Sequence, residues 1–108
     1  MEISFATEAL KEACLARNPN AGDLPRGVLH ALQVLYNAMR NAEHLGELPI
    51  GQPNPAELDD GLEWRADLAD GYGVILRIHH ANPPLKNDEI DFMRVYRVHV
   101  RAIETPDA

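Results

Sequence analysis

Alternation of apolar and polar residues in the second half of the chain predicts three β-strands. The clearest case runs from Leu62 to Leu68, where every second residue is apolar and the residues between them are charged. Asp70-Gly71 is a dipeptide typical of a tight hairpin, so the next strand is expected to run back antiparallel to the first. The predicted strands cover residues 62–68, 72–80 and 90–103 and form an antiparallel meander.

Helical periodicity predicts two helices in the first half of the chain. In the longer helix, apolar residues recur every three or four positions and form one continuous stripe. This stripe consists of Val28, Leu32, Leu35, Met39 and Ala42. Thr7 is a typical N-cap for the shorter helix. The helices are expected over residues 7–17 and 24–45, after a short strand over residues 2–5, and residues 104–108 are expected to be a frayed tail.

Together these elements predict an α+β fold: a short N-terminal strand, two helices, and a three-stranded antiparallel meander packed on the helices. The length of 108 residues is typical of a single domain, so residues 1–108 are expected to share one core.

Composition and charge limit the classes of function. The chain has 10 Lys and Arg against 17 Asp and Glu, and this net charge of −7 disfavours non-specific binding of nucleic acids. Cys14 is the only cysteine, which excludes an intrachain disulfide and favours a reducing compartment. No apolar run approaches the length that a bilayer requires, so the expected location is the cytoplasm, without membrane contact.

The two faces of the predicted sheet differ in character. If Trp64, Leu76 and Val98 face the helices, the alternation also turns Phe92 and Tyr96 inward. The opposite face then collects the basic residues Arg65, Arg77, His79, Arg97, His99 and Arg101, with Glu63 and Asp67 beside them. A chain with an excess of acid therefore gathers half of its arginines on one face of one sheet.

Three interpretations of this charged face are open. Exposed sheet faces are routinely charged, and Glu63 and Asp67 can serve as cross-strand partners for the arginines. Guanidinium groups also match the geometry of phosphate, which makes Arg65, Arg97 and Arg101 candidates for binding RNA. The same side chains can also contact a partner protein.

Element order and local sequence together resemble the RelE/ParE/HigB superfamily of toxins from type II toxin–antitoxin systems. The segment LEWRADLADGYGVILRI at residues 62–78 is similar to the strand–turn–strand segment of that family. The segment LGELP at residues 45–49 is similar to its connector after the second helix, and RVYRVHV at residues 94–100 to its final strand. The resemblance covers residues 2–103.

This resemblance implies a ribosome-dependent mRNA endonuclease that an antitoxin binds and that needs no cofactor. Members of the family stabilise the scissile phosphate and transfer protons with side chains of the sheet face, which implies catalytic roles for Arg77, His79 and His99. The chain departs from the family at two places. Residues 55–60 contain no lysine, and Gly73 stands where the family commonly has an arginine. The sequence therefore favours a diverged member and leaves its enzymatic activity open.

Other chemistries fit the sequence less well. His79 and His80 are adjacent on a predicted strand and are expected to point to opposite faces. His79 and His99 would then supply two ligands, whereas zinc requires three or four, so neither a metal site nor a cofactor is expected. The alternatives are a non-enzymatic module that binds a small molecule or a protein, including a second copy of the chain, and an unrelated α+β fold.

Overall fold

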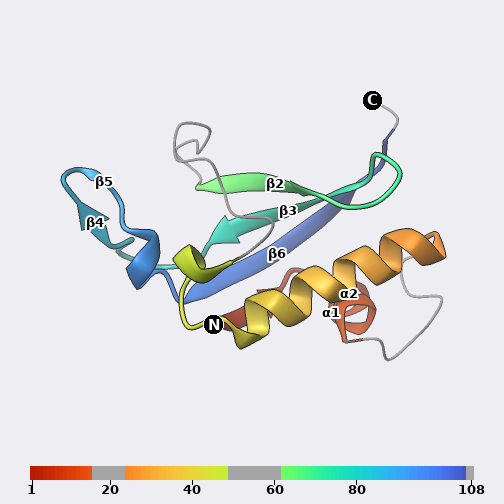
Figure 1. The fold of residues 1–108 in the computed structure, drawn as a ribbon, viewed down its shortest axis with the longest axis horizontal. Helices are drawn as coiled ribbons and strands as arrows, with labels where there is room; N and C mark the ends of the chain where they lie inside the picture. The colour runs from red at the N-terminus through yellow and green to blue at the C-terminus, as the bar shows by residue number, and fades with distance from the viewer. Residues whose placement is uncertain (16–23, 49–61, 107–108) are drawn as a thin grey trace.

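The computed structural model describes residues 1–15, 24–48 and 62–106 of the chain. These residues form an α+β fold in which two α-helices pack against a mixed sheet of four strands (Figure 1). The sheet contains β1 (Glu2–Phe5), β2 (Glu63–Asp67), β3 (Gly73–Ile78) and β6 (Arg97–Glu104). The other elements are α1 (Glu8–Cys14), α2 (Arg26–Asn41), the hairpin β4 (Leu85–Lys86) and β5 (Glu89–Ile90), and the 3₁₀ turns η2 (Leu45–Glu47) and η4 (Phe92–Arg94).

The order of strands in the sheet is β1-β6-β3-β2. Strand β3 pairs antiparallel with both β2 and β6, and β1 lies parallel to β6 on its other side. The parallel register places Glu2 opposite Arg97 and Ser4 opposite His99. Residues from the two ends of the chain thus become neighbours on one face of the sheet.

Helix α1 begins with a side-chain cap, and α2 begins without one. The Oγ1 atom of Thr7 accepts a hydrogen bond from the N–H of Leu10, so the predicted N-cap is confirmed. Helix α2 begins directly after Pro25, a position where a missing N–H costs nothing. It ends at Asn41, earlier than predicted, because Ala42 adopts an extended conformation. Residues 16 and 17 of the first predicted helix lie outside the described residues.

The hydrophobic core lies between the helices and one face of the sheet, which we call the inner face. All five residues of the predicted stripe, four on α2 and Ala42 directly after it, are buried, so that prediction is confirmed. The sheet contributes Trp64, Leu76 and Val98 to the same core, as the alternation predicted. The two α-helices pack on the inner face of the sheet (Figure 1), and neither of them covers the outer face.

Cys14 belongs to this core and is expected to be unreactive. The thiol is buried, and burial raises its pKa to about 12, so the nucleophilic thiolate is scarce at neutral pH. Ellman's reagent should modify the native protein at least about 100-fold more slowly than the urea-unfolded protein, because thiolate and access are both required. Equal rates in the two states would show that Cys14 is not buried in the core.

The predicted strand over residues 90–103 is wrong in its first half. Asn87 and Asp88 both adopt positive φ angles and form the turn of the β4–β5 hairpin. The carboxylate of Asp91 then accepts a hydrogen bond from the N–H of Met93 at 3.1 Å and starts the turn η4. Strand β6 therefore begins only at Arg97.

The later start of β6 changes the position predicted for Tyr96. Because it precedes β6 rather than lying within it, strand alternation does not fix its direction. Its side chain is 46% exposed, so the prediction that Tyr96 faces the core is wrong. Val95 is buried completely in its place, and Phe92, also predicted inward, is half-buried in η4.

A bulge in β6 changes which residues share the outer face. Leu76 pairs with Val100 and Ile75 pairs with Ala102, so Arg101 has no residue opposite it on β3. The extra residue reverses the alternation beyond it and brings Glu104 to the outer face. Glu104 is the last residue of β6 rather than the first of a frayed tail, which corrects that prediction. Residues 107 and 108 lie outside the described residues.

Candidate functional site

The structure places all six predicted site residues on the outer face of the sheet. Five of them line one open hollow of about 830 Å³, and Arg65 does not. His80, which follows the end of β3, lines it as well. We call this feature the basic hollow and define it by Arg77, His79, His80, Arg97, His99 and Arg101. Within the described residues, no carboxylate belongs to its lining.

Two arginines of the basic hollow form ion pairs with residues at its margin. The Nε atom of Arg97 lies 2.7 Å from a carboxylate oxygen of Glu2, its register partner on β1. The Nε atom of Arg101 lies 2.7 Å from a carboxylate oxygen of Glu63 on β2. These pairs fix the guanidinium groups and offset part of their charge.

Arg77 lacks such a partner among the residues that the structure describes. It lies near the end of β3, opposite Glu63 on β2 and opposite His99 on β6. Glu63, however, forms its ion pair with Arg101, the residue that the bulge leaves without a pairing partner on β3. An exposed guanidinium without a carboxylate partner is the strongest local attraction for an anion on this face.

Two imidazole rings form the floor of the hollow beside Arg77. The rings of His79 and His99 are stacked, with centroids 5.1 Å apart and an angle of 25° between the planes. The Nδ1 atom of His99 lies 2.8 Å from the hydroxyl oxygen of Ser4. Burial lowers the pKa of His99, and the nearby His79 and Arg77 lower it further. His99 is therefore neutral at physiological pH and can accept a proton.

His80 lies at the edge of the hollow in contact with Tyr96. Its Nε2 atom accepts a hydrogen bond from the backbone N–H of Tyr96 at 3.2 Å. Burial lowers the pKa of His80, with further contributions from Arg97 and His79, while Glu2 acts in the opposite direction. The ring of His79 stacks on His99 of the outer face, whereas His80 lies beyond the end of β3 at Ile78 and contacts Tyr96.

The lowered pKa values of His80 and His99 are expected to make the protein less stable in acid. Both values lie below the ordinary 6.5, so near that pH the unfolded chain binds more protons than the folded chain. This contribution to the free energy of unfolding should be complete above about pH 6.5 and should decrease as the pH falls below it.

Urea unfolding at about pH 7.5 and about pH 5.5 measures this effect. The change in midpoint between the two should shrink in His99→Gln and stay unchanged in His30→Gln, which alters an exposed residue of α2. An NMR titration that finds His99 protonating at or above the ordinary histidine pKa would contradict the prediction.

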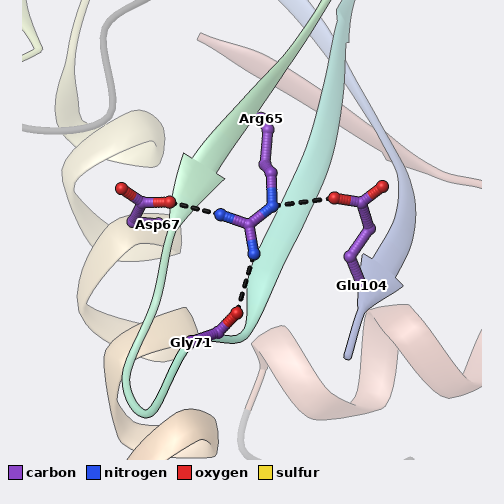
Figure 2. Close-up of polar contacts among 4 residues, drawn as sticks. All are labelled: Arg65, Asp67, Gly71 and Glu104. Atoms are coloured by element: carbon purple, nitrogen blue, oxygen red, sulfur yellow. Dashed lines mark hydrogen bonds and ion pairs between the residues drawn. The ribbon is translucent and has the colours of Figure 1, made fainter. Parts of the chain in front are cut away.

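Arg65 is held at the other end of the outer face, near the β2–β3 hairpin (Figure 2). Its guanidinium donates to Asp67, to the carbonyl oxygen of Gly71 at 2.8 Å and to Glu104 at 2.7 Å. A Cβ atom at Gly73 would overlap this guanidinium, so the glycine makes room for it. Arg65 thus contacts two carboxylates and is already coordinated within the chain.

Sequence reasoning missed several residues around the hollow. Glu2 and Ser4 reach the site only because β1 lies parallel to β6, a long-range pairing that no local pattern predicts. Residues 55–60, which lack the lysines of the family pattern, lie outside the described residues. Where the structure describes the chain, no group of three or more His, Cys, Asp or Glu side chains is arranged to hold a metal ion.

No protein-family model matches the chain, and neither the curated proteins nor the solved structures gave a significant match. The RelE-like resemblance therefore rests on the residues and the element order alone. None of the helices in the described part of the chain has both the length and the apolar character needed to cross a membrane.

Proposed function

We propose that the protein is a diverged member of the RelE-like fold and that its outer sheet face binds RNA through backbone phosphates. The order strand–helix–helix followed by antiparallel pairing of β2, β3 and β6 supports the fold assignment. Coverage of only the inner face by the helices supports the use of the outer face for binding.

The observation that carries the proposal is the basic hollow with Arg77 at its centre. In a chain of net charge −7, three guanidinium groups and three imidazoles line one hollow, and Glu2 and Glu63 at its margin pair with Arg97 and Arg101 but not with Arg77. Arginine binds phosphate with a planar array of donors, and a neighbouring neutral histidine adds a hydrogen bond. Phosphate is therefore the chemical group that this surface fits best.

The same residues provide the parts needed for RNA cleavage. Neutral His99 can take the proton of a ribose 2′-hydroxyl while that oxygen attacks the phosphorus atom. Arg77 can stabilise the negative charge that develops on the phosphate oxygens. His79 can donate a proton to the 5′ oxygen as its bond to phosphorus breaks, which leaves a 2′,3′-cyclic phosphate. Arg97 and Arg101 would hold flanking phosphates, and Arg65 has no role in this scheme.

Binding is tested by fluorescence anisotropy with a labelled single-stranded oligoribonucleotide at several salt concentrations. Three phosphate contacts predict that the logarithm of affinity falls against the logarithm of salt concentration with a slope of about −2. The variant with Arg77, Arg97 and Arg101 all changed to Gln should lose most of this affinity. Absence of salt-dependent binding by the wild-type protein would overturn the proposal.

Cleavage is tested separately, because binding does not require it. The oligoribonucleotide and a translated mRNA should be incubated with the protein, the latter in the presence of ribosomes. A 2′,3′-cyclic phosphate product that disappears in His99→Gln supports the endonuclease, and growth arrest on induced expression supports its toxicity. Intact RNA in both assays, with binding retained, would leave a non-enzymatic RNA-binding module.

Binding of a partner protein, at a separate place on the molecule, is the second candidate function. Leu85 and Met93, on the hairpin β4–β5 and the turn η4, expose 53% and 69% of their surface. Large exposed apolar side chains are typical of protein contacts. Sedimentation of the wild-type protein and of Met93→Ser at several concentrations tests the homodimer, which should dissociate more readily in the variant.

A further inference from the structure

Tyr96 lies at the rim of the basic hollow with its ring exposed. The guanidinium carbon of Arg97 lies 5.3 Å from the centre of the ring. The ring of His80 meets the tyrosine at an angle of 88°, with the centroids 4.6 Å apart. Because Arg97 and His80 both line the hollow, the tyrosine ring is placed directly beside the phosphate-binding groups.

The backbone of Tyr96 is held firmly although its side chain is exposed. Its N–H donates to the Nε2 atom of His80 at 3.2 Å, and its carbonyl oxygen accepts from the N–H of Glu2 at 2.8 Å. The preceding residue, Val95, is buried completely. An aromatic ring on an immobilised backbone loses little conformational entropy when a ligand packs against it.

We propose that Tyr96 is a base-stacking platform and that the basic hollow takes single-stranded rather than double-stranded RNA. This inference rests on the proposed function. In a duplex, each base is stacked between its neighbours and offers no face to a protein side chain. In a single strand, a nucleotide whose phosphate contacts Arg97 can turn its base onto the exposed part of the ring.

Three probes test the proposal on three forms of the protein. The probes are a single-stranded oligoribonucleotide, the same strand annealed to its complement, and inorganic tripolyphosphate, which has no base. The proteins are the wild type, Tyr96→Phe, which keeps the ring, and Tyr96→Ser, which removes it. Thermal unfolding of each variant shows whether the fold is intact.

Wild-type protein should bind the single strand more tightly than the duplex. Tyr96→Ser should weaken single-strand binding roughly ten-fold, since stacking on an aromatic side chain contributes that order of affinity. The same variant should bind tripolyphosphate as the wild type does, and Tyr96→Phe should match the wild type with all three probes. A 2-aminopurine base in the single strand should lose fluorescence on binding to the wild type and keep it with Tyr96→Ser.

Two results would overturn the inference while leaving phosphate binding intact. One is equal affinity of the wild-type protein for single strand and duplex, and the other is unchanged single-strand binding by Tyr96→Ser. Failure of the wild-type protein to bind either tripolyphosphate or RNA would instead overturn the proposed function itself, and the stacking platform with it.

Discussion

Replacing Arg77 with glutamate is expected to weaken binding of single-stranded RNA by about 100-fold at low salt. A hydrogen-bonded contact between charged groups contributes about 1.5–3 kcal/mol, and the new carboxylate adds repulsion at the same place. Arg77 should be the most sensitive arginine because no described carboxylate offsets its charge. Arg101→Glu should cost less, since Glu63 already neutralises part of that cation.

The matched control is Arg26→Glu, which changes the net charge by the same amount. Arg26 is exposed in the first turn of α2, where an acidic residue is favoured by the helix dipole, so the fold should tolerate it. Anisotropy titrations of both variants over a range of salt should show a shallower salt dependence only for Arg77→Glu. Equal losses in the two variants would mean that total charge, rather than the basic hollow, governs binding.

Replacing Leu76 with alanine is expected to lower the free energy of unfolding by about 2–5 kcal/mol. Leu76 is completely buried on β3, opposite Trp64 on β2 and Val100 on β6. The shortened side chain leaves a cavity that the paired strands cannot close without breaking their register. Since small domains are stable by about 5–15 kcal/mol, the loss would be a large part of the total.

Urea unfolding followed by circular dichroism measures this loss. The control is Val34→Ala, which shortens an aliphatic residue that is 43% exposed on α2. Its effect should stay within about 0.5 kcal/mol, as is usual for surface positions. If both variants unfold at the same urea concentration, β3 does not lie at the centre of the core.

The parts of the fold that were predictable are those that local chemistry determines. Asp70 and Gly71 both adopt the positive φ angles that an Asp-Gly hairpin requires, and the strands on either side pair as the turn dictates. The start of β6 was not predictable in the same way. The residues before it include strand-forming Val95 and Tyr96, yet the carbonyl oxygen of Val95 accepts a hydrogen bond from the N–H of Leu45 at 2.9 Å. That contact joins distant segments and leaves no local signal.

The sequence predicted which residues share the outer face of the sheet, but it did not predict which ion pairs they form there. Alternation alone identified Arg77 and His99, because they lie on the regular parts of β3 and β6, and His79 follows directly after the last residue of β3. It could not foresee that the bulge at Arg101 turns Glu104 outward to bind Arg65. A single inserted residue reverses every later side chain, and its position depends on how two strands fit together.

The two ends of the outer face differ in charge, and the residues around Gly73 form the hairpin end. The hairpin end of the sheet carries one guanidinium, from Arg65, and the glycine at position 73 leaves the space that this group occupies. Asp67 and Glu104 nevertheless leave that end with a net negative charge, while Arg77 lies toward the opposite end of β3. A polyanion lying along the strands would be repelled at the hairpin. A bound strand is therefore expected to cross the sheet at the level of Arg77 and Arg97, from β3 over β6 toward β1.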